Sequence, residues 1–213
     1  MLKLNEIFYS MQGEGKSTGL SKLFIRLSGC NNKCSFCDTK YHIKSRSLNA
    51  KDIILLKKYK EWVITGGEPL LQQIEILNLI EKFKPNSIDI ETNGTIIPCD
   101  NLISRINCFN ISPKEVRSQP KGYNLKPSIL RMIPRLENRI IKFVYSDKIS
   151  EQFISRYIKE YNLRPWEIWI MPEGATREKL IKNSQKVWNY CIEKDFNFSA
   201  RLQVWVFNIK RGI

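Results

Sequence analysis

The sequence predicts an α/β fold, a partial TIM-like βα barrel of about six parallel strands that forms a single domain over residues 1–213. Short apolar runs alternate with longer segments whose apolar residues recur at helical spacing. Gly, Asn, Ser or Pro residues follow most of the apolar runs, as expected where strands end. No repeat, low-complexity tract or linker divides the chain. Strands that alternate with helices form parallel sheets, which bind ligands at the carboxyl ends of their strands.

Seven apolar runs are predicted as strands, and three segments between them as helices. The strands, in chain order, cover residues 23–27, 62–65, 88–91, 108–111, 140–145, 167–171 and 201–207. The helical patterns cover residues 74–83, 153–161 and 180–192. The segment from Ser112 to Arg139 carries four prolines and many basic residues. It is predicted as a long irregular excursion, either a solvated loop or a lid at a strand's carboxyl end.

The chain carries 35 Lys and Arg residues against 21 Asp and Glu residues, a formal net charge of +14. A basic surface can bind nucleic acid or attract small anionic molecules. The basic residues are spread along the whole chain, which favours a composition bias over a nucleic-acid site. No run of 18 apolar residues is present, and the first residues lack a signal-peptide pattern. We therefore expect a cytoplasmic protein that binds neither membrane nor nucleic acid.

Three of the six cysteines lie within eight residues, at Cys30, Cys34 and Cys37. In a cytosolic chain, clustered cysteines bind metal more often than they form disulfides. Three thiolates can hold three corners of a [4Fe–4S] cubane, which needs four ligands, so one iron would stay open for chemistry. The alternative is a zinc site completed by His42, the only histidine. The spacing of the cysteines does not separate these two hypotheses.

Two motifs together resemble the radical S-adenosylmethionine superfamily. The cysteine triad directly follows the first predicted strand and has Phe36 before its last member. Gly66-Gly67-Glu68-Pro69 follows the second strand, where that superfamily carries its GGEP motif. The resemblance implies that the amino and carboxylate groups of S-adenosylmethionine bind the open iron. Without a Cβ, the two glycines could approach the amino group closely, and Glu68 could accept its hydrogen bond.

Over essentially its whole length the chain resembles the 7-carboxy-7-deazaguanine synthase family. The matching segments are Ser10–Gly15 (SMQGEG), Phe24–Cys30 (FIRLSGC), Cys37–Thr39 (CDT), Glu91–Gly94 (ETNG), Ser112–Lys114 (SPK) and Lys210–Ile213 (KRGI). The resemblance implies a lyase-type radical enzyme that converts 6-carboxy-5,6,7,8-tetrahydropterin to 7-carboxy-7-deazaguanine with loss of ammonia, in queuosine and 7-deazapurine biosynthesis. It also implies Mg²⁺, an external electron donor of the flavodoxin or ferredoxin type, and a homodimer.

The resemblance assigns roles to three groups of residues. Substrate contacts fall on Met11, Gln12, Gly13, Glu14, Arg26, Thr92 and the C-terminal Ile213. Contacts with S-adenosylmethionine fall on Phe36, Asp38, Gly66, Gly67, Glu68, Gly94, Ser112, Pro113, Lys114, Met171, Pro172, Glu173 and Gly174. The metal ligands are Cys30, Cys34 and Cys37 for the cluster and Thr39 for Mg²⁺. No side chain is assigned as a general acid or base, because the cofactor supplies the reactive radical.

The chain departs from the family at two positions and leaves two other functions open. Gln203 stands where the family often has a histidine, and Met171 where it usually has glutamine. The first alternative function is a glycyl-radical enzyme activase acting on a protein partner, which has no reason to carry the QGEG segment. The second is a non-enzymatic module that binds zinc and nucleic acid, which metal analysis separates from an iron–sulfur enzyme.

Overall fold

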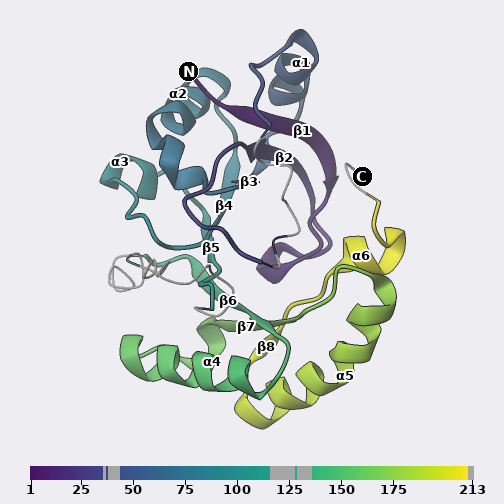
Figure 1. The fold of residues 1–213 in the computed structure, drawn as a ribbon. Helices are drawn as coiled ribbons and strands as arrows, with labels where there is room; N and C mark the ends of the chain where they lie inside the picture. The colour runs from purple at the N-terminus through teal and green to yellow at the C-terminus, as the bar shows by residue number, and fades with distance from the viewer. Residues whose placement is uncertain (36, 38–43, 116–127, 129–135, 211–213) are drawn as a thin grey trace.

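In the described part of the chain, eight strands form one curved sheet and lie in chain order from β1 to β8 (Figure 1). The computed structural model describes residues 1–35, 37, 44–115, 128 and 136–210. β1 runs antiparallel to β2, and each later strand runs parallel to its neighbour. The strands are β1 (Leu4–Met11), β2 (Ser21–Leu27), β3 (Glu61–Gly66), β4 (Ser87–Thr92), β5 (Cys108–Ile111), β6 (Arg139–Tyr145), β7 (Ile168–Pro172) and β8 (Asn197–Phe198).

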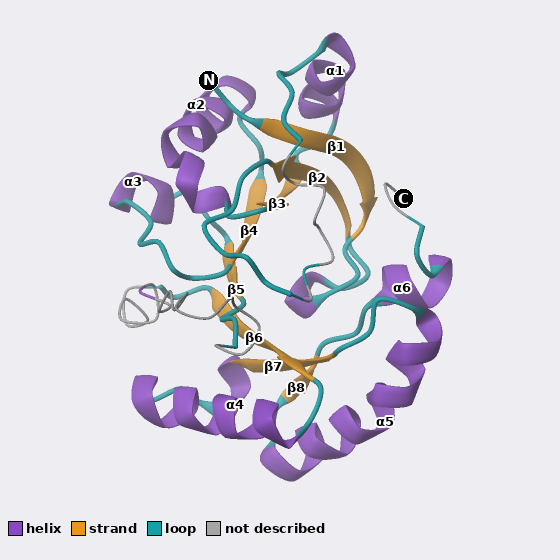
Figure 2. Ribbon diagram, viewed as in Figure 1, coloured by secondary structure: helices purple, strands orange, loops and turns teal. Residues whose placement is uncertain are grey.

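Helices surround the outer, convex side of this sheet (Figure 2). The α-helices are α1 (Ala50–Lys58), α2 (Gln73–Phe83), α3 (Asp100–Ile103), α4 (Lys148–Tyr161), α5 (Arg177–Lys194) and α6 (Leu202–Phe207). Short 3₁₀ helices are η1 (Gly15–Ser17), η3 (Pro69–Gln72) and η6 (Pro165–Glu167). Within the residues that the structure describes, no helix has the length and apolar character needed to cross a membrane.

The predicted α/β class and the incomplete barrel are confirmed. The sheet curves without closing, so β1 and β8 are its two edges. Seven described strands, β2 to β8, are parallel, one more than the predicted number of about six.

The two faces of the sheet differ in chemistry. Ile25, Ile64 and Ile90 lie in register on neighbouring strands and are completely buried. They belong to one apolar cluster that also contains residues of α2, α4 and α5. Alternate residues of a strand point to the other face, and here they include Thr65 and Lys142, which are also buried. Since buried polar groups need partners, the inside of the curve suits a polar network or ligand.

Short polar side chains start the longer helices. Asn49 and Asp52 form a capping box at the start of α1. Asp147 and Thr176 accept hydrogen bonds from first-turn N–H groups of α4 and α5. These caps satisfy backbone donors that a helix start leaves unpaired. They explain why the periodic segments at residues 153–161 and 180–192 belong to helices that begin several residues earlier.

The predicted last strand at residues 201–207 is wrong, because this segment contains helix α6. Leu202, Val204 and Val206 alternate with other residues and so imitate a strand pattern. Only Val204 is buried, whereas Leu202 and Val206 are exposed. The N–H group of Val204 donates to the Arg201 carbonyl at 3.0 Å, which closes a helical turn. The last strand is instead the two-residue β8.

The sequence prediction also lacks β1, α1 and α3. β1 is an edge strand in which Leu4 and Ile7 are buried while Tyr9 and Met11 are exposed, so its apolar pattern is weak. α1 and α3 are short helices with few buried residues. Most of the predicted excursion from Ser112 to Arg139 lies outside the described residues.

Candidate active site

The loop that follows β2 carries the three clustered cysteines. Cys30, Cys34 and Cys37 are all half-buried. The N–H group of Asn32 donates to Cys30 Sγ at 3.4 Å. Burial raises the pKa of the Cys30 thiol, and the charges of Glu68 and the other two cysteines raise it further. Because a bound metal displaces thiol protons, the three sulfurs form a donor set that suits a metal centre.

A [4Fe–4S] cluster fits this donor set. A cubane takes one thiolate on each of three irons and leaves the fourth iron for another ligand. Among the described residues, no three Cys, His, Asp or Glu side chains converge where a single metal ion could lie. The predicted site residues Phe36, Asp38, Thr39 and Ile213, and His42 of the zinc alternative, lie outside the described residues. Their roles stay predictions.

The turn after β3 packs so closely on the cysteine loop that two of its positions require glycine. Gly66 has a φ of +130°, and a Cβ there would lie 2.1 Å from the Leu27 carbonyl oxygen. A Cβ on Gly67 would lie 1.9 Å from the Gly29 carbonyl oxygen. The Gly67 N–H donates to the Leu27 carbonyl at 3.2 Å. These glycines therefore hold the GGEP turn against the loop that carries the cysteines.

Glu68 connects this turn to the ETNG loop that follows β4. Its side chain is completely buried. Oε1 accepts hydrogen bonds from the Leu70 N–H at 3.0 Å and the Thr92 hydroxyl at 2.7 Å, and Oε2 accepts one from the Asn93 N–H at 2.7 Å. Burial raises the pKa of Glu68, and these donors offset only part of the effect. Glu68 thus fixes the relative position of two predicted cofactor loops.

We expect Thr92→Val to destabilise the protein by about 1–3 kcal/mol, because it removes a donor from the buried Glu68 carboxylate. Denaturant unfolding of the cluster-free protein measures the change. Thr92→Ser keeps the hydroxyl and should lose clearly less stability. Equal losses in the two variants would show that the methyl group, and not the hydrogen bond, matters at this position.

Asn31 and Asn93 tie the ETNG loop directly to the cysteine loop, and sequence reasoning gave neither a role. The Asn93 side-chain amide donates to Asn31 Oδ1 at 3.0 Å and lies 4.0 Å from Cys30 Sγ. Asn31 in turn donates to the Thr95 hydroxyl at 2.7 Å. Asparagine is common in loops, so only its place beside Cys30 could have drawn attention to Asn31.

The SPK segment after β5 lies beside the same loops. The Ser112 N–H donates to the Thr92 carbonyl at 2.8 Å, and Lys114 Nζ donates to the Ser112 hydroxyl at 3.0 Å. The Gly94 N–H donates to the Thr92 hydroxyl at 3.0 Å. The structure therefore brings the predicted cofactor residues after β3, β4 and β5 together through the backbone and side chain of Thr92.

The Met171–Gly174 loop lies farther along the sheet, at the end of β7. The Glu173 N–H donates to the Tyr145 carbonyl at 2.9 Å, and its carboxylate forms an ion pair with Lys179 of α5 at 2.8 Å. The Gly174 carbonyl accepts a hydrogen bond from Arg201 Nη1 at 2.8 Å. A main-chain contact from β6 and a side-chain contact from the segment after β8 thus hold this loop.

The QGEG loop, residues 12–15, reaches across the inside of the sheet. Gln12 Nε2 donates to Glu91 Oε1 at 3.0 Å, and the other Glu91 oxygen accepts from the Thr65 hydroxyl at 2.7 Å. The Glu14 N–H donates to Gln12 Oε1 at 3.1 Å. Met11, also a predicted substrate contact, is exposed at the end of β1. The loop is therefore anchored on β4 through Gln12.

Glu14 is the centre of a buried charge network. Its Oε2 lies 2.5 Å from Lys142 Nζ, and its Oε1 lies 2.9 Å from Arg201 Nε. Gln203 Nε2 also donates to Oε1 at 2.7 Å. Burial alone would raise the pKa of Glu14, but Lys142 and Arg201 lower it well below its ordinary value. Glu14 also keeps the pKa of Lys142 raised despite burial, so both groups are charged.

Sequence reasoning missed Lys142 and Arg201, although it named Glu14 and Gln203. Lys142 lies in the middle of an apolar strand, where a lysine is unusual, and this was the available signal. Arg201 lay within the segment predicted as a strand. Gln203, noted as a departure from the family, contacts Glu14 directly.

Arg26 extends from β2 toward the neighbouring edge strand. Its Nε lies 2.8 Å from Glu6 Oε1, and its guanidinium lies 5.8 Å from the centre of the Phe8 ring. To bind a substrate carboxylate, as predicted, this side chain would exchange or share its contact with Glu6.

The charge on Glu14 predicts how stability changes in acid. A carboxyl whose pKa is lower in the folded state stabilises the protein above its unfolded pKa, and this contribution is lost as the pH falls toward the folded pKa. The ordinary pKa is 4.5 and the folded value is lower. We expect the free energy of unfolding to fall below about pH 4.5, and to fall less steeply in Glu14→Gln. Denaturant unfolding at successive pH values tests this. If the unfolding free energies of wild type and Glu14→Gln fall equally steeply with pH, the prediction is wrong.

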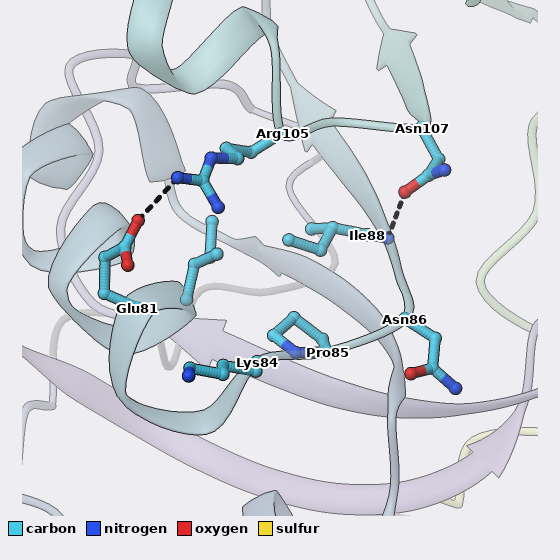
Figure 3. Close-up of a pocket in the computed structure, with 8 residues that line it drawn as sticks. Glu81, Lys84, Pro85, Asn86, Ile88, Arg105 and Asn107 are labelled. Carbon is cyan, nitrogen blue, oxygen red and sulfur yellow. Dashed lines mark hydrogen bonds and ion pairs between the residues drawn. The ribbon is translucent and has the colours of Figure 1, made fainter.

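A pocket among the described residues lies away from this site. It has a volume of about 280 Å³ and lies between the end of α2 and the start of β5, where Glu81 and Arg105 form an ion pair (Figure 3). This is the amino end of the strands, opposite the cysteine loop. Beside Gln12 and Glu14 there is a hollow of about 10 Å³, which is room for about one water molecule. Chemistry, and not volume, therefore identifies the candidate site.

Comparisons with known proteins agree with this chemistry. The profile of the Radical SAM superfamily matches residues 24–136. A 7-carboxy-7-deazaguanine synthase from Hyperthermus butylicus is 30% identical over 97% of this chain and 93% of its own length. One from Methanospirillum hungatei is 32% identical over 95% of this chain and 82% of its own length. The crystal structure of QueE from Escherichia coli shares the fold, with a TM-score of 0.69, 23% identity, and coverage of 93% of this chain and 92% of that one. The chain belongs to the 7-carboxy-7-deazaguanine synthase family of the radical SAM superfamily.

Proposed function

We propose that this protein converts 6-carboxy-5,6,7,8-tetrahydropterin to 7-carboxy-7-deazaguanine in queuosine and 7-deazapurine biosynthesis. The substrate has the atoms of the product plus one ammonia, so the lyase-type reaction needs no net oxidant or reductant. The observation that carries the proposal is the buried Glu14 network. It anchors the QGEG loop inside the same curved sheet whose strand ends carry the cysteine and GGEP loops.

Glu14 is suited to the edge of a pterin that presents several N–H donors. An ionised carboxylate offers about four lone-pair positions. Arg201 and Gln203 use two positions on Oε1, and Lys142 uses one on Oε2. Counting the described residues alone, one position on Oε2 is left for a substrate N–H, and the low pKa keeps Glu14 a pure acceptor. Arg26 would bind the substrate carboxylate through its planar fork.

The cofactor side is built from the loops joined by Glu68. Cys30, Cys34 and Cys37 would hold a [4Fe–4S] cluster, which together with S-adenosylmethionine would supply the power to abstract a hydrogen atom. Lys114 offers a positive charge to the cofactor carboxylate. The backbone of Gly66 and Gly67 offers acceptors to its amino group, while Glu68 holds both turns in place.

Four further features are part of the proposal and follow from the family resemblance. Thr39 would bind a Mg²⁺ that also contacts substrate, since a hydroxyl oxygen is a suitable hard ligand. A flavodoxin or ferredoxin would supply the electron that reduces the cluster. The protein would act as a homodimer in the cytoplasm.

An anaerobic product assay tests the proposed function. Reduced, iron-reconstituted protein is mixed with S-adenosylmethionine, Mg²⁺ and 6-carboxy-5,6,7,8-tetrahydropterin, and mass spectrometry follows the products. We expect 7-carboxy-7-deazaguanine and ammonia in equal amounts. If S-adenosylmethionine is cleaved without any deazapurine, the substrate assignment is wrong and an activase with a protein substrate becomes the better hypothesis. If the protein holds zinc and no iron, the radical chemistry itself is wrong.

A further inference from the structure

Arg201 contacts two functional loops that are far apart in the sequence. Its guanidinium donates through Nε to Glu14 Oε1 at 2.9 Å and through Nη1 to the Gly174 carbonyl at 2.8 Å. Glu14 belongs to the loop predicted to bind substrate, and Gly174 to a loop predicted to bind S-adenosylmethionine. The side chain is 10% exposed, so both contacts are shielded from water.

The segment that carries Arg201 is itself packed against the QGEG loop. The Leu202 N–H donates to the Gly13 carbonyl at 3.0 Å. A Cβ on Gly13 would lie 1.8 Å from the side-chain oxygen of Gln203, so the two segments are in close contact here. Residues 201–203 are therefore packed directly against the QGEG loop.

The Met171–Gly174 loop is held on its other side by α5. A Cβ on Gly174 would lie 2.7 Å from the backbone of Leu180, and Asn183 Nδ2 donates to the Glu173 carbonyl at 2.6 Å. Arg201 thus lies between the Met171–Gly174 loop, which packs on α5, and the QGEG loop, which contacts β4 and β6. In Figure 1 the chain after β8 runs to α6, close to the end of α5 that follows β7.

We propose that Arg201 is a positioning residue that fixes the QGEG loop relative to the Met171–Gly174 loop. The inference rests on the proposed function, in which these loops hold substrate and S-adenosylmethionine. A guanidinium presents donors in a rigid plane and can hold two acceptors at a set distance and angle, whereas the single nitrogen of lysine cannot. Arg201 therefore determines how closely the substrate carbon approaches the cofactor.

Hydrogen exchange measured by mass spectrometry tests the mechanical part of the proposal. The experiment compares the full-length holoenzyme with Arg201→Lys, which keeps the charge but loses the fork. We expect several-fold faster exchange in peptides covering residues 12–17 and residues 173–176 together, since both loops lose an anchor. Faster exchange in one loop alone, or in neither, would show that Arg201 does not fix the two loops relative to each other.

Arg177→Lys is a matched control. Arg177 also uses its guanidinium on two acceptors, the carbonyls of Trp205 and Val206 in α6, at 2.7 and 2.8 Å. Its loss should loosen α6 while both loops keep wild-type exchange. If Arg177→Lys loosens the two loops as much as Arg201→Lys does, the effect belongs to α6 as a whole and the proposal fails. Arg201→Gln replaces Arg201→Lys if the latter does not fold.

Product ratios test the functional part. A misplaced substrate reduces hydrogen transfer more than cofactor cleavage, so Arg201→Lys should form product about 10- to 100-fold more slowly than wild type. It should also release several-fold more 5′-deoxyadenosine per product, with a smaller change in KM than in kcat. If Arg201→Lys releases as much 5′-deoxyadenosine per product as the wild type, Arg201 has no role in placing the substrate. If wild-type enzyme itself makes no product, the proposed function fails. The exchange experiment still tests whether Arg201 connects the two loops.

Discussion

Cys30→Ala is expected to abolish cluster assembly and, with it, all cleavage of S-adenosylmethionine. A cubane that leaves one iron open for a cofactor depends on all three protein thiolates. The surrounding loops hold Cys30 through the Asn32 N–H and the nearby amide of Asn93.

The measurement is iron and sulfide per chain after anaerobic reconstitution, together with visible absorbance and methionine release. Cys99→Ala is the matched control, because Cys99 is an exposed cysteine outside the triad. It should bind iron and cleave the cofactor as the wild type does. A Cys30→Ala variant that keeps its full iron content would show that the cluster lies elsewhere. A wild-type chain that binds one zinc and no iron would support the alternative of a zinc site.

The positions of the parallel strands β2 to β7 could be predicted because each of these strands is an apolar run. Ile25, Ile64 and Ile90 lie in such runs and form the central layer of the core. The edge elements could not be predicted in the same way. β1 buries only part of one face, and in α6 the alternating apolar residues of a short exposed helix have the period of a strand. The spacing of apolar residues reflects which side chains are buried, so it does not predict an element whose burial is incomplete.

The candidate site shows a similar division. The cysteine triad, GGEP and ETNG are local motifs, and the structure brings them together through Glu68 and Thr92. The partners of Glu14 could not be predicted, because Lys142 and Arg201 lie 128 and 187 residues away in the chain. Their approach depends on the curvature of the whole sheet and on where β8 ends. No local pattern carries that information.

Lys142→Met is expected to destabilise the protein by about 3–5 kcal/mol, the usual cost of removing one partner from a buried ion pair. The side chains of Lys142 and Glu14 are only 6% and 14% exposed. The substitution removes the cation that pairs with Glu14 Oε2. Methionine has a similar length to lysine, so no large cavity forms. For a chain of this size the loss corresponds to a fall in melting temperature of about 6–20 °C.

Two further variants separate the charge effect from packing. The Lys142→Met and Glu14→Gln double variant removes the carboxylate that has lost one of its cations, so it should cost clearly less stability than the sum of the two single variants. Lys179→Met removes an ion pair with Glu173 that is exposed to water, and it should change the unfolding free energy by at most about 1 kcal/mol. If Lys142→Met unfolds at the wild-type denaturant concentration, Arg201 and Gln203 suffice to stabilise Glu14. In that case Lys142 would be available to contact substrate directly, and its loss would appear in KM instead of in stability.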